Sequence, residues 1–296
     1  MALTNPIKKK IQVLKLEYDK LLPGKDSLLL IIDEAEIPEN VFNSNAIENS
    51  TLTLKETEKI LLEMELSRDV SLREVFEAKN LARVINYTRE KSKEAELSKE
   101  LILLLHQMLI GGIDDKIAGR FRKKGEYVRV GSYIAPAPEQ VERMIESIFF
   151  KYKSDLDSYF LEKIAKFHLD FESTHPFCDG NGRIGRVLIN FQLLGVGLPR
   201  VIIRDKEKKE YYRAFSDYRD KKNTKTMEKI LALALTEAMH RRIAYLRGEK
   251  IVTLADYIRS YKLSAPAFLN SARRQNIPAF REKGVWKIGD NFKTKK

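Results

Sequence analysis

Apolar residues recur along most of the chain at the three- and four-residue spacing of an α-helix. This spacing places them on one face of each helix and leaves polar residues on the other. Ser98 and Pro138 stand at the start of two such runs, where helices commonly begin. The pattern predicts helices over residues 52–66, 72–88, 98–110, 139–151, 159–173, 183–194, 206–219 and 226–246. We therefore expect a mostly α-helical fold.

The segment between the third and fourth predicted helices has a different pattern. Phe121, Tyr127, Val128 and Val130 surround the turn-forming sequence Lys123–Gly125. Apolar and aromatic residues on either side of such a turn predict a β-hairpin. We expect this hairpin to interrupt an otherwise helical core.

The long helical patterns end near Gly248. We therefore expect three parts: an N-terminal helical region over residues 1–97, a core over residues 98–247 and a compact C-terminal module over residues 248–296. Residues 3–39 are expected to form a helical and extended leader in which we see no catalytic groups.

The composition indicates a globular protein. Of the 296 residues, 43% are apolar, which is enough for a sizeable core. No apolar run approaches the length needed to span a bilayer, and the N-terminus lacks the pattern of a secretory signal. The single cysteine, Cys178, excludes an intrachain disulfide framework. We expect a cytoplasmic protein with no membrane segment.

The formal net charge of +12 raises the question of a polyanionic partner. Residues 262–296 contain nine lysines and arginines and only two acidic residues. A basic surface can simply keep a protein soluble, or it can bind a polyanion, for which nucleic acid is the natural candidate.

The richest chemistry lies in residues 175–186, with the sequence HPFCDGNGRIGR. Gly180 and Gly182 let backbone N–H groups approach a ligand closely, just where a helix is predicted to begin. A helix N-terminus presents unsatisfied N–H groups and positive potential to anions. Arg183 and Arg186 project from one face of this helix and can clamp phosphate oxygens.

Three further side chains in this segment complete a candidate active site. Asp179 offers the oxygen ligand that Mg²⁺ prefers, and Mg²⁺ commonly accompanies nucleotide phosphates. Asn181 can donate a hydrogen bond to a phosphate oxygen. His175 has the imidazole expected of a general base near neutral pH.

The spacing of Gly180, Gly182 and Gly185 also matches a dinucleotide-binding fingerprint, with Asp205 about twenty residues further on. That fingerprint requires a strand before the glycines and alternating strands and helices around them. A helix is predicted here instead, so we reject this interpretation.

The segment HPFCDGNGRIGR resembles the signature HPFx[D/E]GNGRxxR of the Fic family. The resemblance extends over residues 43–219 and implies a helical core with a hairpin flap over the active site. It also implies that His175 deprotonates a hydroxyl group on a target protein, either another protein or this one. That oxygen would attack the α-phosphorus of ATP and release pyrophosphate, with Mg²⁺ bound by Asp179.

The same resemblance implies the remaining contacts of the nucleotide. Arg183 would bind near the β-phosphate and Arg186 the γ-phosphate. The implied nucleotide site comprises Val130, Gly131, Ser132, Tyr133, Asp179, Gly180, Asn181, Gly182, Arg183, Ile184, Gly185, Arg186, Tyr211 and Tyr212.

Upstream, residues 44–49 fit the inhibitory pattern of this family, [S/T]xxxE[G/N], through Ser44, Glu48 and Asn49. A glutamate paired with Arg186 would remove the clamp for the γ-phosphate. The alternative is that Glu48 is an ordinary solvated helix residue.

The C-terminal module resembles a winged helix-turn-helix. Helices are expected over residues 254–260 and 267–274, followed by a hairpin wing over residues 277–287. The basic residues available for phosphate contacts are Arg273, Arg274, Arg281, Lys283 and Lys287. DNA binding is one use of such a module, and protein docking or formation of a homodimer is another.

The leading hypothesis is therefore a protein adenylyltransferase restrained by Glu48. Alternatives within the same chemistry are another nucleotide donor or the reverse reaction, removal of AMP. A different class of function is a DNA-associated regulator whose Fic core only senses nucleotide. His175 favours an enzyme, because nucleotide sensing does not require a base.

Overall fold

The computed structural model describes residues 5–65, 70–131 and 133–293 and confirms the mostly helical prediction. Within these residues, a π-helical turn η1 (Lys59–Glu63) follows α3 and a 3₁₀ turn η2 (Asp205–Glu207) precedes α9. The α-helices are α1 (Asn5–Leu21), α2 (Asp26–Ile47), α3 (Leu54–Glu58), α4 (Leu72–Lys91), α5 (Lys99–Ile110), α6 (Pro138–Ser154), α7 (Phe160–Thr174), α8 (Asn181–Gly195), α9 (Lys208–Lys221), α10 (Lys225–Leu246), α11 (Leu254–Ser260) and α12 (Ala265–Arg273).

Side-chain caps fix several of the helix starts. The Ser98 hydroxyl accepts a hydrogen bond from the N–H of Leu101 at 3.2 Å, and Pro138 occupies the first turn of α6. Thr53 and Glu56 form a capping box at the start of α3. Each cap satisfies a backbone N–H that the helix itself leaves unpaired.

The segment of residues 175–186 is supported by helices packed from both sides. α7 and α8 lie against one another, and α7 also packs on α10. Phe171, Phe177 and Ile184 are fully buried in one apolar cluster, whereas Leu161 and Ile189 belong to a second cluster with α1 and α10. The connection between α7 and α8 is thus held by apolar packing on both sides.

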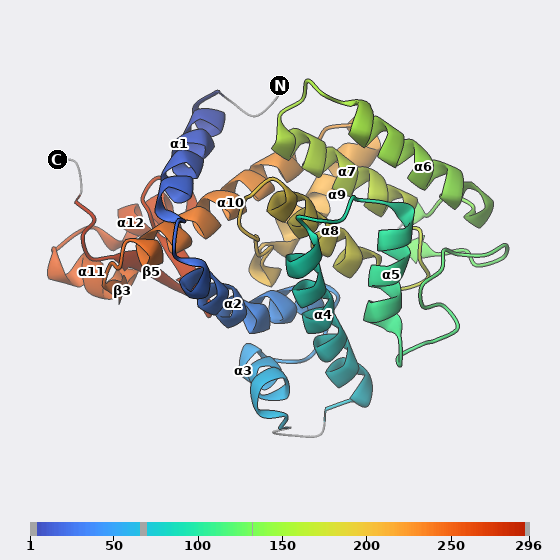
Figure 1. The fold of residues 1–296 in the computed structure, drawn as a ribbon, viewed down its shortest axis with the longest axis horizontal. Coiled ribbons are helices and arrows are strands. Elements are labelled where there is room, and N and C mark those ends of the chain that lie inside the picture. Colours follow the sequence, from blue (N-terminus) through green and yellow to red (C-terminus); the bar gives the residue numbers. More distant parts are fainter. Residues whose placement is uncertain (1–4, 66–69, 132, 294–296) are drawn as a thin grey trace.

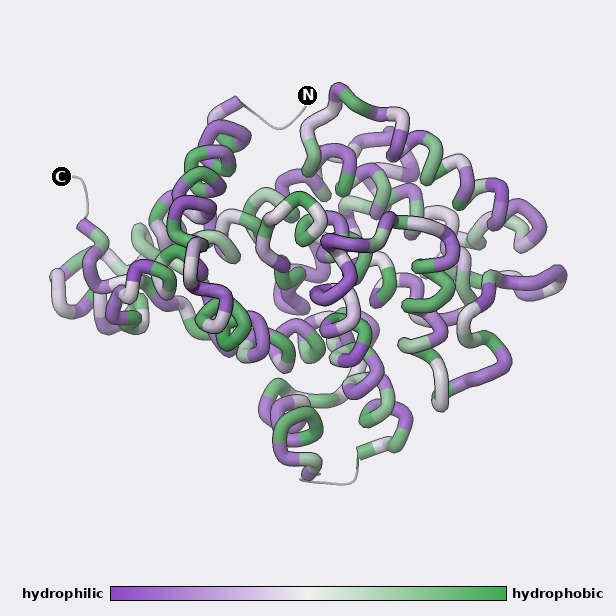
Figure 2. The backbone as a smooth tube through the Cα atoms, in the orientation of Figure 1, coloured by the Kyte–Doolittle hydropathy of each residue, from purple (hydrophilic) through white to green (hydrophobic). Residues whose placement is uncertain are grey.

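The predicted hairpin is present, but its turn was placed wrongly. Strands β1 (Arg129–Val130) and β2 (Tyr133–Ile134) pair antiparallel, so the chain reverses between Val130 and Tyr133. Around Lys123–Gly125 the chain forms a separate loop, closed by the ion pair of Arg120 with Glu126 at 2.7 Å. This loop is polar along most of its length and projects from the core (Figure 2). Within it the N–H of Lys123 donates to the Glu126 carboxylate at 2.6 Å and the N–H of Glu126 donates to the carbonyl of Lys123 at 2.9 Å, so these groups are paired without a neighbouring strand.

The predicted leader is more ordered than its sequence pattern indicated. Residues 5–21 form α1, and α2 continues from Asp26 through Pro38 to Ile47, so the second half of the predicted leader and the start of the predicted inhibitory segment belong to one helix. Figure 1 shows α2 passing between the C-terminal module at one end of the molecule and the helical core. The same helix therefore reaches both parts.

The C-terminal module combines α11 and α12 with a three-stranded antiparallel sheet in the order β3-β5-β4. Its strands are β3 (Ile251–Thr253), β4 (Phe280–Glu282) and β5 (Val285–Gly289), and an apolar cluster of its own lies between helices and sheet. DNA binding by this module stays a prediction. None of the described helices is long and apolar enough to cross a membrane.

Candidate active site

The candidate catalytic loop connects the end of α7 to the start of α8. His175 closes α7 in the left-handed backbone region, with φ of 49°, and its N–H donates to the carbonyl of Phe171 at 2.9 Å. Gly180, with φ of 80°, makes the second reversal and leads into α8. A left-handed conformation at this point favours glycine because it carries no Cβ. The first-turn N–H groups of α8 thus border the loop.

Buried side chains hold this loop in shape. Both polar atoms of the Asn181 side chain bond to the backbone of Phe177 at 2.9 Å, so Asn181 braces the loop from inside. The His106 ring stacks on that of Phe177 at 3.7 Å, accepts from the N–H of Gly119 and bonds the carbonyl of Asp179, both at 3.0 Å. One accepting and one donating nitrogen define a neutral imidazole. Sequence reasoning gave His106 no part in the site.

A cavity of about 420 Å³ opens beside the loop and brings distant segments of the chain together. The end of α2, the β1–β2 hairpin, α7, the loop that follows it, α8 and α9 all contribute to its wall. The lining residues are Glu48, Val130, Gly131, Tyr133, Glu172, Ser173, His175, Gly182, Arg186, Tyr211, Tyr212, Phe215, Ser216 and Arg219.

His175 lies in this wall with a nitrogen available for chemistry. Its Nδ1 is buried and makes no hydrogen bond within the described part of the chain. Burial is the main cause of the lowered pKa of His175, about 4; a hydrogen bond to the backbone of Glu172 opposes this shift and the nearby charge of Arg122 adds to it. The imidazole is therefore neutral at physiological pH and able to accept a proton.

Arg186 is buried and held by the end of α2. Its Nε donates to the Ser44 hydroxyl at 2.9 Å, and its Nη2 donates to the Ser44 carbonyl and to Glu48 Oε1, both at 2.8 Å. The third nitrogen, Nη1, is buried and makes no hydrogen bond among the described residues. Two segments separated by more than 130 residues thus meet in one charge-assisted contact.

The Glu48 carboxylate also lies directly against the start of α8. A Cβ placed on Gly182 would come within 2.2 Å of Glu48 Oε1 and 3.1 Å of Arg186 Nη1. Only glycine leaves room for this approach. An anion therefore occupies the N-terminus of α8, where the helix dipole and free N–H groups favour negative charge.

Asp179 and Arg183 form a second charged group just outside the cavity. Asp179 pairs with Arg183 at 3.0 Å and with Arg73 at 2.5 Å, and Arg183 also pairs with Glu77 at 3.2 Å. Burial opposes ionisation of Asp179, but the two arginines and the N–H of Gly180 more than offset it and lower the pKa of Asp179. Nothing in the local sequence indicated Arg73 or Glu77, which come from α4.

Six predicted nucleotide contacts among the described residues are absent from the cavity wall: Asp179, Gly180, Asn181, Arg183, Ile184 and Gly185. The Asn181 amide, predicted to bind phosphate, instead bonds to the backbone of Phe177. Ile184 is fully buried in the apolar core. Gly185 faces α7, where an added Cβ would come within 2.4 Å of Glu172 and 2.8 Å of His168. These residues let α8 pack closely on α7. Asn49, with φ of 69°, ends the inhibitory segment without entering the cavity wall.

The flap and the tyrosines face the cavity from the other side. Val130, Gly131 and Tyr133 line it, whereas Ser132 lies outside the described residues. The Tyr133 hydroxyl donates to the carbonyl of Ser173. The flap is thereby fastened to the end of α7, close to the catalytic loop.

The paired tyrosines have different surroundings. Tyr211 is almost completely buried, and its hydroxyl bonds His168 Nε2 at 2.8 Å. Tyr212 is half-exposed, and its hydroxyl donates to the carbonyl of Ile47 at 2.9 Å, at the last turn of α2. Tyr212 therefore contacts the inhibitory segment as well as the cavity.

Glu172 is a cavity residue that sequence reasoning missed. Its Oε1 is buried and makes no hydrogen bond within the described residues. The pKa of Glu172 is raised to about 8, mainly by burial and also by the neighbouring Glu48 carboxylate, while Arg186 partly offsets the shift. At neutral pH this carboxyl group is protonated and can donate a hydrogen bond into the cavity.

The four histidines predict how stability depends on pH. Burial lowers their pKa values from 6.5 to about 4 for His106, His175 and His240 and to about 3 for His168. Between pH 6.5 and 4 the unfolded chain therefore binds more protons than the folded one. The free energy of unfolding should fall as the pH is lowered through this window, by up to about 1.4 kcal/mol per pH unit for each histidine.

Two measurements check this expectation. The denaturant midpoint should decrease from pH 7 to pH 6 and again from pH 6 to pH 5. The imidazole NMR signals of the folded protein should not titrate above pH 5. Signals that titrate near pH 6.5 would contradict it.

Comparison with known proteins places this site in a family. Residues 96–193 match the sequence profile of the Fic/DOC family. A protein adenylyltransferase Fic of Nematostella vectensis is 31% identical over 179 residues, which cover 59% of this chain and 41% of that protein. The protein adenylyltransferase fic-1 of Caenorhabditis elegans is 28% identical over 243 residues, covering 80% of this chain and 44% of that protein. This chain thus spans less than half the length of these relatives.

Comparison with solved structures agrees with the profile match. A Fic domain containing signaling protein from Bacteroides thetaiotaomicron superposes with a TM-score of 0.74 over 81% of this chain and 98% of that chain, at 24% identity. At this identity the similarity shows a shared fold. With the profile match and the relatives, it leads to one conclusion: residues 96–193 carry a region that matches the Fic/DOC family, within a fold that this chain shares with a Fic domain containing protein.

Proposed function

We propose that this protein transfers AMP from ATP to a hydroxyl group of a protein, with His175 as the general base. The observation that carries the proposal is the pair of buried, unbonded nitrogens, His175 Nδ1 and Arg186 Nη1, in residues that line one cavity at the start of α8. A buried polar atom without a partner indicates a ligand that supplies one. A neutral base beside an anion-binding helix start suits transfer of a phosphoryl-containing group.

The proposed reaction needs one proton acceptor and a phosphate cradle. His175 takes the proton of the acceptor hydroxyl as its oxygen attacks the α-phosphorus of ATP. A bond forms between that oxygen and the α-phosphorus, and the bond to the bridging oxygen breaks to release pyrophosphate. The amides at Gly182 and the guanidinium of Arg186 hold the phosphates in line, which is the main task in such transfers.

Asp179 fits the role of a Mg²⁺ ligand. Mg²⁺ is commonly bound by one or two carboxylates together with substrate phosphates, and it neutralises charge on the phosphate oxygens. Asp179 is ionised, and 35% of its side chain is exposed beside the loop. Arg73, whose side chain is 58% exposed, can move aside when an ion replaces it as the partner of Asp179.

Glu48 is the proposed brake on this reaction. Its carboxylate lies where the resemblance to the family puts the γ-phosphate, against Gly182 and paired with Arg186. ATP would have to displace it or bind with its phosphates shifted from the attacking hydroxyl. Either result lowers the rate without removing any catalytic group.

Metal removal tests the proposal on the Glu48→Gly protein. Incubated with ATP and Mg²⁺, this protein should gain the mass of one or more AMP groups on itself or on an added protein acceptor. EDTA should abolish the gain, and Asp179→Asn should lower the rate on the order of 100-fold, because the metal contributes several kcal/mol to the transition state.

Glu65→Gly, which removes an exposed carboxylate far from the loop in sequence, is the matched control and should leave the Mg²⁺ dependence unchanged. Undiminished transfer in EDTA would contradict the assignment of Asp179. An adduct obtained only with another nucleoside triphosphate would keep the chemistry but change the donor. Release of AMP from a modified acceptor would favour the reverse reaction.

The geometry gives less support to a DNA-associated regulator. Three of the five basic residues that could contact DNA are engaged within the protein: Arg281 with Glu237, Lys283 with Glu58 and Lys287 with Glu282. Arg273 and Arg274 remain exposed on and after α12. We therefore do not extend the proposal to DNA.

A further inference from the structure

The C-terminal module contacts the inhibitory helix through the turn between β4 and β5. This turn consists of Lys283 and Gly284, both with positive φ, of 51° and 77°. Their two N–H groups donate to the carboxylate of Glu39 on α2, each at 3.1 Å. Glu39 is only 4% exposed. A buried carboxylate of α2 is thus bound by the backbone of the turn.

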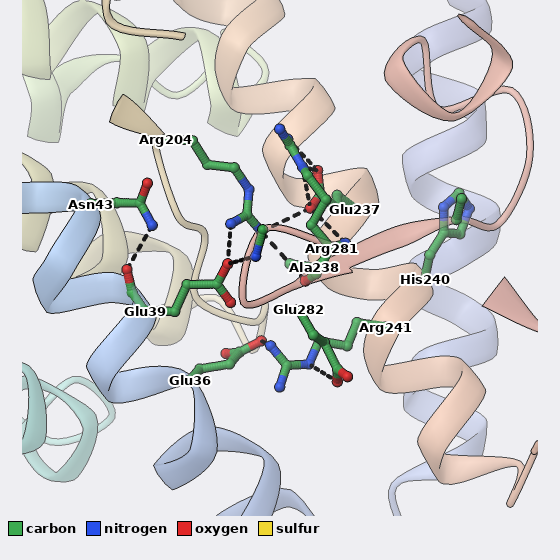
Figure 3. A network of polar contacts seen from close by, with 12 residues as sticks. Glu36, Glu39, Asn43, Arg204, Glu237, Ala238, His240, Arg241, Arg281 and Glu282 are labelled. Atoms are coloured by element: carbon green, nitrogen blue, oxygen red, sulfur yellow. Dashed lines mark hydrogen bonds and ion pairs between the residues drawn. The ribbon is translucent and has the colours of Figure 1, made fainter. Parts of the chain in front are cut away.

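Two chains of ion pairs reinforce this contact, as Figure 3 shows. In the first, Arg204 bonds both Glu39 and Glu237, and Glu237 also binds Arg281 of β4 at 2.6 Å. Burial opposes ionisation of Glu237, but the two arginines more than offset it and lower the pKa of Glu237. These ion pairs therefore run without a break from α2 to β4.

The second chain lies one helical turn earlier on α2. Glu36 pairs with Arg241 at 3.1 Å, and Arg241 pairs with Glu282 of β4 at the same distance. Glu36, which precedes Glu39 on α2, is thus also linked to the module. The module also packs on α10, where the ring centroids of Phe280 and Tyr245 lie 6.2 Å apart, but charged and backbone groups make up the contacts with α2 described above. Polar interfaces of this kind separate more readily than apolar ones.

The anchored part of α2 leads directly into the inhibitory contact. Ser44 and Glu48 follow Glu39 by five and nine residues, about 7.5 and 13.5 Å along the same helix. Asn43 donates to the carbonyl of Glu39 at 2.8 Å and accepts from the N–H of Asp205 at 3.1 Å, which fixes the intervening turn. A helix moves as a rigid element over this distance, so the position of Glu39 sets that of Glu48.

We propose that the Lys283–Gly284 turn is a latch that holds α2, and through it Glu48, against Arg186, so that displacement of the C-terminal module releases the active site. This inference rests on the proposed inhibitory role of Glu48. It makes Glu39 a positioning residue, which acts through Glu48 and touches neither ATP nor the acceptor.

Labelling rates of four proteins test the latch: wild type, Glu39→Ala, Glu48→Gly and the double variant, all at matched ATP. Glu39→Ala should raise the rate about tenfold, because it removes the carboxylate that binds the turn. Added to Glu48→Gly, it should change the rate less than about twofold, since no brake remains to be released. A purely structural role would lower the rate in both backgrounds.

Conservative and surface variants complete the design. Glu39→Gln keeps a carbonyl acceptor for one turn N–H and should fall between wild type and Glu39→Ala. Glu34→Ala removes an exposed carboxylate from the same helix and should match wild type. If Glu39→Ala does not fold, Lys283→Glu provides the test. In the present structure Lys283 Nζ lies 2.9 Å from Glu58 Oε1, so the substitution replaces an ion pair at the exposed edge of the latch with two like charges. It should raise the rate about threefold.

The outcomes separate the latch from the brake. Activation by Glu48→Gly alone, with Glu39→Ala and Lys283→Glu both at the wild-type rate, would refute the latch and leave the brake intact. No activation by Glu48→Gly would refute the brake and with it the latch. The latch would also be refuted if the rate increase of the double variant equalled the product of the increases of Glu39→Ala and Glu48→Gly, because the two residues would then act independently.

Discussion

Glu48→Gly protein should transfer AMP about 10- to 100-fold faster than wild type at the same ATP concentration. The substitution removes one charge-assisted hydrogen bond to Arg186, of the kind that contributes about 1.5–3 kcal/mol, and frees the start of α8 for phosphate. Ser44 still accepts two hydrogen bonds from Arg186, so the arginine stays in place. The measurement is the initial rate of incorporation of AMP into protein.

Glu48→Gln is the informative companion variant. It keeps the size and a hydrogen-bond acceptor but loses the charge, so its rate should lie between those of wild type and Glu48→Gly. Glu65→Gly should leave the rate at the wild-type level. Equal rates for wild type, Glu48→Gln and Glu48→Gly would refute the proposed brake.

His175→Ala, made in the Glu48→Gly background, should lower transfer by about 10²- to 10⁴-fold, the usual contribution of a general base. ATP affinity should remain within a few-fold, because Arg186 and the amides at the start of α8 are unchanged. Incorporation of AMP measures the first quantity and calorimetric titration with ATP the second. Transfer that survives the substitution would mean that another group accepts the proton.

If His175→Ala loses ATP binding together with AMP transfer, the substitution has distorted the site. His175 occupies a left-handed position that ends α7, with φ of 49°. An alanine there could disturb the loop that supports the phosphates. Retained ATP binding is therefore the control that separates removal of the base from distortion of the site.

The sequence predicted the elements whose signals are local. α5 and α7 each bury one largely apolar face, and the motif around Gly180 needs only residues that are neighbours in the chain. The pairing of Glu48 with Arg186 could also be anticipated, although the residues are far apart, because each lies in a recognisable motif. Such features depend on composition and spacing within a short window.

Other features depend on contacts that no short window contains. α2 was only partly anticipated because Glu36 and Glu39 are buried, facing arginines of other segments, so its polar residues do not mark a solvent-exposed face. Arg73, which binds Asp179, and Glu172, whose pKa depends on burial, likewise acquire their surroundings only in the folded chain. The hairpin turn was misplaced because the side chain of Glu126 closes a loop where a strand pair was expected.

The central claim is best tested with ATP labelled separately at the α- and γ-phosphates. Glu48→Gly protein and the double variant with His175→Ala are incubated with each label and Mg²⁺. The account predicts label on protein only from the α-phosphate and only when His175 is present. Label from the γ-phosphate would show a kinase, and label that persists without His175 would contradict the assigned base.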